Sequence, residues 1–195
     1  MSFLFTPQME KRITPRVHRM LEVALRRFPE LQGKTITVGY TRANLGTAMI
    51  PIGPQSEAEM GIRLNVRNLT YNTIGHELTH LAQGLSQHSK KAARKSRRAA
   101  LGKIPGGETQ CDIWTLARSD LFCDDAPVYL KLPRNIRRDW PRYARSVRAL
   151  CIAAIEKRQT YRLYIRWLES QIKELSRQSF AENAEDLQLH LPFVC

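Results

Sequence analysis

TIGHELTHLAQG, residues 73–84, is the stretch of the sequence that decides the fold. Apolar residues recur along and just beyond it at the helical steps of four, three and four: Ile74, Leu78, Leu81 and Leu85. This period predicts an amphipathic helix that packs its apolar stripe against a core. Gly84 is predicted to lie near the C-terminal end of the helix.

Two histidines and a glutamate lie on this helix outside its apolar stripe. At about 100° per residue, the side chains of His76 and His80 project about 40° apart, with Glu77 beside them. Both histidines point away from the stripe, toward a cleft or toward solvent. An HExxH pattern is expected by chance in only about 0.008 copies per chain of this composition. We therefore predict a zinc site at His76 and His80, with a solvated surface pair as the alternative.

A catalytic zinc site requires a third protein ligand and an open position for water. Glu108 opens a second predicted helix, which runs from residue 108 to about residue 122, and Asp112 follows one turn later. The two carboxylates therefore share one helix face. We predict Glu108 as the third ligand and Asp112 as the hydrogen-bond partner that orients a ligand imidazole. The alternatives are an ordinary first-turn acid for Glu108 and a surface acid for Asp112.

His88 is a second candidate for the third ligand, eight positions after His80. The metzincin pattern HExxHxxGxxH requires glycine and histidine three and six positions after His80, where Gln83 and Ser86 stand instead. His88 is therefore better interpreted as a loop histidine.

The rest of the chain predicts an α+β fold. An amphipathic helix is expected over residues 7–31, followed by three short strands at Thr35 to Tyr40, Ala48 to Ile52 and Ile62 to Val66. After Pro133, the apolar period predicts one long amphipathic helix, or two helices broken near Gln159. The apolar tail from Leu187 to Cys195 is expected to dock on the core or, alternatively, as a strand across a cleft.

The motif HELTH, followed on a downstream helix by ETQCD at residues 108–112, resembles the gluzincin clan of zinc metallopeptidases, whose signature is HExxH with a separate ExxxD. The order of helix, three strands, HExxH helix and glutamate helix is similar to the compact minigluzincins over roughly residues 8–123. The resemblance implies a zincin-like domain, placed here at residues 1–132. The residues after Pro133 lie outside the resemblance, and we expect a helical extension over residues 133–195 packed on the domain. The resemblance also implies Zn²⁺ on His76, His80 and Glu108.

The same resemblance implies a zinc-dependent endopeptidase that hydrolyses peptide or protein substrates, with Glu77 as the general base. The strand from Ile62 to Arg67 is expected to form the rim of the cleft and to bind an extended substrate. Gluzincins commonly use a tyrosine or a histidine from elsewhere in the chain to stabilise the oxyanion. No motif assigns this role here, and Tyr129, Tyr143 and Tyr161 are candidates.

The net charge of +13 creates a positive field that suits acidic partners, nucleic acid among them. Seven basic residues and no acid lie in residues 89–103, and seven more lie between Lys131 and Arg148. These clusters are interpreted as a solvated basic face or as a weak phosphate-binding surface. The alternative function is therefore a nucleic-acid-binding protein whose zinc site is structural or absent, or a protease recruited to nucleic acid. A fourth protein ligand, such as His88 or Cys111, would favour structural zinc.

Composition and cysteine usage complete the expectations. A hydrophobic fraction of 43% is typical of a globular chain, and the four scattered cysteines are expected to be reduced thiols. The N-terminal residues lack a secretory pattern and no apolar run is long enough to span a membrane, so a cytoplasmic location is expected.

Overall fold

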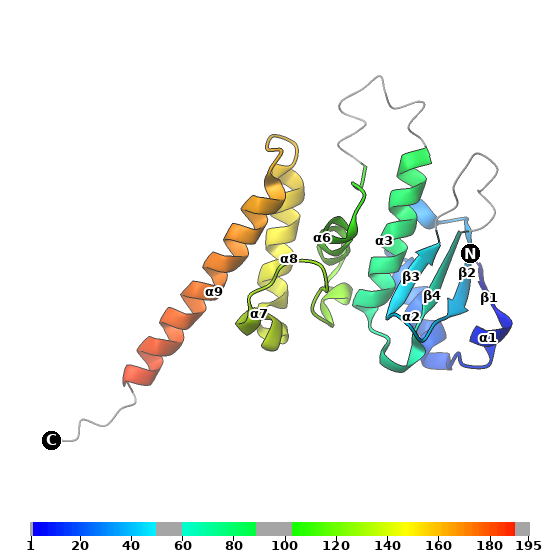
Figure 1. Cartoon of the computed structure of the whole chain (residues 1–195), viewed down its shortest axis with the longest axis horizontal. Coiled ribbons are helices and arrows are strands. Elements are labelled where there is room, and N and C mark those ends of the chain that lie inside the picture. Colours follow the sequence, from blue (N-terminus) through cyan, green and yellow to red (C-terminus); the bar gives the residue numbers. More distant parts are fainter. Residues whose placement is uncertain (1, 50–59, 89–102, 190–195) are drawn as a thin grey trace.

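The computed structural model describes residues 2–49, 60–88 and 103–189. Within these residues the chain has the predicted α+β class, with seven α-helices and one four-stranded mixed sheet (Figure 1). The basic segment at residues 89–102 and the tail at residues 190–195 lie outside the described residues. Leu187 to Leu189 of the predicted tail continue the last helix.

The sheet consists of β1 (Ser2–Phe5), β2 (Thr35–Tyr40), β3 (Gly46–Met49) and β4 (Met60–Leu64) in the order β1-β2-β4-β3. The first three strands in this order are parallel, whereas β3 runs antiparallel to β4 and forms an edge. The three predicted strands are present: β2 has the predicted bounds, β3 begins two residues earlier than predicted, and β4 both begins and ends two residues earlier. The short strand β1 was not predicted.

The N-terminal helix differs from the prediction over residues 7–31. The chain forms α1 (Pro7–Glu10), α2 (Pro15–Leu25) and a 3₁₀ turn (Pro29–Leu31). The break before α2 has a direct cause. A proline inside a helix removes a hydrogen bond and clashes with the preceding turn, so Pro15 starts a helix, and the Thr14 side chain caps it.

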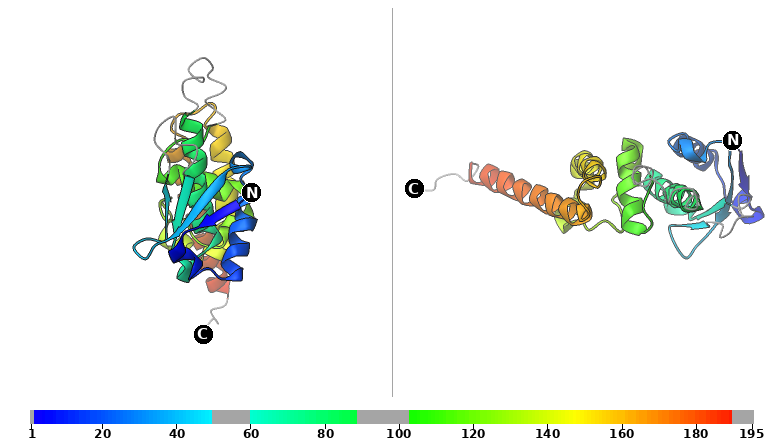
Figure 2. Two further views of the ribbon diagram at one scale, coloured as in Figure 1. Left: turned by 90° about the vertical axis from the view of Figure 1, so that its right-hand side faces the viewer. Right: turned by 90° about the horizontal axis from the view of Figure 1, so that it is seen from above.

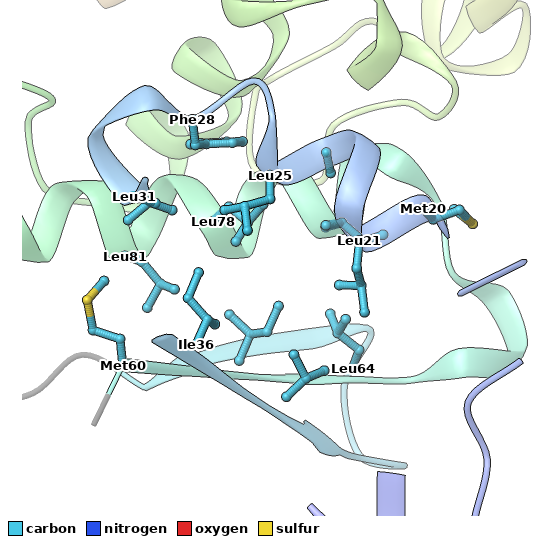
Figure 3. Close-up of a cluster of buried hydrophobic side chains, with 14 of the residues drawn as sticks. Met20, Leu21, Leu25, Phe28, Leu31, Ile36, Met60, Leu64, Leu78 and Leu81 are labelled. Carbon is cyan, nitrogen blue, oxygen red and sulfur yellow. The ribbon is translucent and has the colours of Figure 1, made fainter. Parts of the chain in front are cut away.

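The first hydrophobic core lies between the sheet and the two helices α2 and α3, where α3 spans Tyr71–His88 (Figure 3). The side chains labelled in Figure 3 are buried and come from both layers: Met20, Leu21, Leu25, Phe28, Leu31, Ile36, Met60, Leu64, Leu78 and Leu81. The predicted apolar stripe of α3 is therefore confirmed as the stripe that faces the sheet.

Helix α3 continues past Gly84, which was predicted to lie near its end. Among the described glycines only Gly33 and Gly107 have a positive φ, so Gly84 does not adopt the left-handed conformation that stops a helix. At the other end of α3, the Asp124 carboxylate accepts hydrogen bonds from the backbone N–H groups of Tyr71 (2.6 Å) and Asn72 (2.8 Å). A negative charge at this end also matches the helix dipole.

Helix α6 (Glu108–Arg118) packs across α3 on the side away from the sheet (Figure 2). The predicted helix to residue 122 ends earlier, because Ser119 is extended and its side chain caps a separate 3₁₀ turn at Asp120–Cys123. Phe122 in this turn packs into the first core.

The second hydrophobic core joins α6 to α7 (Arg134–Arg138), α8 (Trp140–Lys157) and α9 (Tyr164–Leu189). Of the two alternatives predicted after Pro133, the structure has the two helices broken near Gln159, whereas α7 was not predicted. The buried residues of this core are Ile113, Leu116, Leu130, Ile136, Trp140, Tyr143, Ala144, Val147, Cys151, Ala154, Tyr164, Leu168 and Ile172. Helix α6 thus lies between α3 and the C-terminal helices.

The connection between α8 and α9 also packs on α6. The Arg158 guanidinium lies over the Trp114 ring, 5.5 Å from its centroid, and donates a hydrogen bond to the Lys103 carbonyl (3.0 Å). The Tyr164 hydroxyl hydrogen-bonds the side-chain oxygen of Gln110. Among the described residues, no helix combines the length and apolar composition needed to cross a membrane.

Gly75 marks a close approach between α3 and the neighbouring elements. A Cβ atom at this position would lie 2.6 Å from Phe122 Cδ1 and 2.7 Å from Thr115 Cγ2.

We expect Gly75→Ala to lower the free energy of unfolding by about 1–3 kcal/mol, because overpacking outweighs the gain in helix propensity. Urea denaturation measures this change. The control is Ser146→Ala, an exposed change on α8, which we expect to leave stability unchanged or slightly higher; equal stabilities of the two variants would contradict the close packing.

Candidate metal centre and its cleft

The five predicted site residues line one cleft of about 700 Å³. Helix α3 supplies the HExxH residues and α6 supplies the two acids: His76, Glu77, His80, Glu108 and Asp112. Residues 43–48, which include the start of β3, and residues 128–129 form the other walls. The histidines therefore face a cleft, which was one of the two directions left open by the helical period.

Three ligand atoms converge in this cleft. The Nε2 atoms of His76 and His80 lie 2.9 Å and 3.0 Å from the same carboxylate oxygen, Oε2 of Glu108. Ligand atoms at about 2.0–2.1 Å from a tetrahedral zinc ion lie about 3.3 Å apart. Both N···O separations are within a few tenths of an ångström of this value, so the contacts of His76 and His80 with Glu108 are compatible with a zinc site.

The ionisable side chains in the cleft shift one another's pKa values. Burial acts to lower the pKa of His76, but the hydrogen bond and charge of Asp112, together with Glu77 and Glu108, raise the pKa overall. Burial acts to raise the pKa of Glu108, but hydrogen bonds and charges from His76 and His80 lower the pKa overall. The network therefore favours an ionised Glu108, the form in which a carboxylate binds a metal.

Asp112 orients the His76 ring through a hydrogen bond to its Nδ1 atom. Its Oδ1 accepts a hydrogen bond from His76 Nδ1 (2.8 Å), and its Oδ2 accepts from the backbone N–H groups of Tyr129 (2.6 Å) and Leu130 (2.7 Å). The carboxylate is only 1% exposed. With a proton held on Nδ1, the lone pair of His76 Nε2 points toward Glu108, as a metal ligand requires. This is the contact predicted for Asp112.

Cys111 offers a different third ligand. The ligand atoms of His76, His80 and Cys111 lie within 4.8 Å of one another, so this trio is also within metal-binding distance. Its sulfur, however, approaches His80 at Nδ1 (3.1 Å), on the opposite side of the ring from the Nε2 atom that faces Glu108. Burial raises the pKa of the Cys111 thiol, which disfavours the thiolate that a metal binds. Glu108 therefore fits the third position better.

His88, the other alternative, is the last residue of α3 and lies two helical turns beyond His80. Its side chain is outside the described part of the structure.

Glu77 lies against β3, at the side of the cleft. Gly46 of β3 approaches so closely that a Cβ atom there would lie 2.6 Å from Glu77 Oε1, and the backbone N–H of Ala48 donates a hydrogen bond to the carboxylate. Burial raises the pKa of Glu77 to about 7, with Glu108 adding to the rise while His76 and Ala48 oppose it. A buried carboxyl with this pKa can both accept and release a proton near neutrality.

The rim of the cleft is β3 and not the segment from Ile62 to Arg67, so that prediction is wrong. β3 pairs with the outer edge of β4 and therefore separates β4 from the cleft. Neither Arg63 nor Arg67, the two arginines of that predicted segment, lines the cleft.

Of the three tyrosines considered for the oxyanion role, only Tyr129 lines the cleft. Its ring stacks on His76 with centroids 5.5 Å apart and an angle of 23° between the planes. Burial and the charges of Glu108, Glu77 and Asp112 raise the pKa of Tyr129, so its hydroxyl remains a hydrogen-bond donor. Tyr143 is buried in the second core, and Tyr161 is exposed near the connection between α8 and α9.

Sequence reasoning missed Gln83, which contacts the second histidine. Its Oε1 lies 3.0 Å from His80 Nδ1, and its side chain is 2% exposed. The spacing of three residues from His80 on one helix is the signal that could have identified this pair.

No protein-family model, curated protein or solved structure matches the chain. The resemblance to gluzincins therefore rests on the motif residues.

The Asp112 carboxylate links α3, α6 and the segment at 129–130, so we expect Asp112→Asn to be destabilising. An amide has only one acceptor oxygen, and its NH₂ group would face at least one of the three donors. Leaving a buried donor without an acceptor costs about 1–3 kcal/mol of unfolding free energy. Chemical denaturation of metal-free protein measures this loss. Asp125→Asn, an exposed change, is the control; a loss no larger than that of the control would show that the three contacts do not stabilise the fold.

Proposed function

We propose that the chain is a zinc-dependent metalloendopeptidase of the gluzincin type. One observation carries the proposal: two imidazole Nε2 atoms each lie within 3.0 Å of one Glu108 oxygen, next to a buried carboxyl in an open cleft. The ligand set would be His76, His80 and Glu108, with Asp112 orienting His76. The α+β fold, with its edge strand beside the HExxH helix, is compatible with a zincin-like domain.

A zinc ion held by these ligands would supply Lewis acidity, acidifying a water and polarising the substrate carbonyl. The remaining steps belong to side chains of the chain. Glu77 takes a proton from the attacking water, for which a pKa of about 7 is suited, and passes it to the leaving amine. The Tyr129 hydroxyl donates a hydrogen bond to the oxygen on which negative charge develops.

An extended peptide is the substrate shape that this cleft favours. β3 is the terminal strand of the described sheet, and one of its edges faces the cleft. Such an edge presents backbone donors and acceptors to which a peptide can add as a further strand. A peptide bound in this way would lie alongside Glu77 and the three proposed ligands.

Two matched substitutions test the proposed metal ligands and the proposed general base independently. We expect about one zinc ion per wild-type chain purified without a metal-affinity tag, and markedly less for Glu108→Ala, because one of three ligands is lost. Glu77→Gln is expected to retain zinc, since Glu77 is not a ligand, and to lose at least about 100-fold in turnover of a peptide substrate. Elemental mass spectrometry and a peptide-cleavage assay measure the two quantities.

These two variants serve as controls for each other, because both remove one acid from the same cleft. Wild-type protein without zinc after reconstitution would overturn the metal site. Cleavage by Glu77→Gln at the wild-type rate would overturn the assignment of the base.

Nucleic-acid binding is a second candidate function, favoured by a row of arginines on α7 and α8. Four of them are exposed, and within the described residues none of the four forms an ion pair: Arg134, Arg138, Arg142 and Arg145. By contrast, Arg137 binds the carbonyls of Pro127 and Leu130, and Arg148 pairs with Asp120. A row of unpaired guanidinium groups suits contact with a phosphate backbone.

This candidate is tested by fluorescence anisotropy with a short DNA duplex over a range of salt concentrations. If the row binds phosphates, the combined Arg138→Gln, Arg142→Gln and Arg145→Gln variant loses affinity, and the slope of log K against log salt falls by about 0.9 per lost contact. The control removes the same charge from α2 and the residue that follows it, at Arg16, Arg19 and Arg26, which are also exposed. Equal losses in the two variants would mean that only net charge matters, and no binding at low salt would exclude the function.

A further inference from the structure

Gln83 is a buried amide whose orientation is fixed by its neighbours. Its Nε2 atom donates hydrogen bonds to the backbone carbonyls of Pro105 (2.6 Å) and Gly107 (3.4 Å). A carbonyl oxygen can only accept, so the nitrogen of the amide must be on this side. The amide oxygen is then directed the other way, and it lies 3.0 Å from His80 Nδ1.

This orientation determines where His80 carries its proton. The amide oxygen of Gln83 can only accept, so this contact is a hydrogen bond only when His80 Nδ1 donates and holds a hydrogen. The Cys111 sulfur, 3.1 Å from the same nitrogen, can accept as well as donate and is compatible with this tautomer. In the neutral ring, Nε2 then keeps its lone pair, which points toward Glu108 Oε2 at 3.0 Å. Without Gln83, the tautomer with the proton on Nε2 would gain a hydrogen bond to that same oxygen. Such a proton would occupy the position that a metal ion needs.

The second contribution of Gln83 concerns Glu108 itself. Gly107, one of its two backbone acceptors, directly precedes Glu108 and has a φ of 110°. The amide thus joins His80 on α3 to the turn that starts α6. His76 receives the corresponding support from Asp112 on α6, whereas His80 receives it from its own helix, one turn later.

We propose that Gln83 is the positioning residue for the second histidine: it holds His80 in the Nδ1–H tautomer and fixes the start of α6, so that His80 Nε2 and Glu108 Oε2 meet. The metal affinity that follows from this role rests on the proposed zinc site. The role itself, a defined tautomer of His80, is a property of the metal-free chain.

Thr79 provides a matched control on the same helix. It is fully buried, and its hydroxyl donates to the Gly75 carbonyl (2.8 Å) and contacts the Thr115 hydroxyl (2.8 Å). It therefore links α3 to α6 through hydrogen bonds, as Gln83 does, but no hydrogen bond joins it to a histidine or to Glu108 in the described structure. Thr79→Val removes a buried link of the same kind without a direct effect on the three ligand atoms.

The first test measures the dissociation constant for zinc by competition with a chromogenic chelator. We expect Gln83→Met, which keeps the length of the side chain and removes its hydrogen bonds, to weaken zinc binding about 10- to 100-fold. Thr79→Val is expected to bind zinc as the wild type does, even where it lowers the melting temperature of the metal-free protein. Equal zinc affinities for Gln83→Met and wild type would overturn the inference and leave the proposed function in place.

The second test needs neither zinc nor a variant that folds. Proton–nitrogen correlation spectra of the imidazole groups in metal-free wild-type protein, recorded at alkaline pH, report the tautomer of His80. The Nδ1–H form supports the inference, including in the case that the wild type binds no zinc and the proposed function fails. The Nε2–H form overturns the inference whatever the zinc affinity.

Discussion

The site depends on one buried carboxylate. Asp112 is almost fully shielded from water, and an ionised group in that position is stable only if its hydrogen-bonding capacity is used. Its three donors come from different parts of the chain: His76 from α3, and the backbone of Tyr129 and Leu130 from the segment before α7. The carboxylate therefore requires these segments to meet at one point, and the wall of the cleft follows from that requirement.

The C-terminal helices contribute to the same geometry through α6. This helix has one side against α3 and the other against α8, and Trp114 packs against both cores. Glu108 and Asp112 thus occupy a helix that is held from two sides. The helical extension after residue 133 supports the glutamate helix, and the second core draws Ile113 and Leu116 from that helix.

Features that depend on spacing within one helix could be predicted from the sequence, whereas features that depend on contacts between distant segments could not. Spacing within one helix placed His76 and His80 in one cleft, because helical geometry is local and regular. The pairing order of strands is set by contacts between distant segments, so the position of β3 outside β4 could not be obtained from alternation alone. Tyr129 illustrates the same limit, since it reaches His76 only because Asp112 binds the backbone of its segment. Gln83 differs from Tyr129, because its spacing of three residues from His80 on one helix could have been recognised in the sequence.

The close approach of Gly46 to Glu77 has an evolutionary consequence. Any residue with a Cβ atom at this position would displace the Glu77 carboxyl. Gly46 is nevertheless distant in sequence from the three proposed ligands and is not one of them. The proposed metal ligands and the placement of the proposed base thus depend on different positions. Drift at this one strand residue would convert the proposed peptidase into a pseudoenzyme, a protein that keeps the proposed metal site and the cleft without the activity.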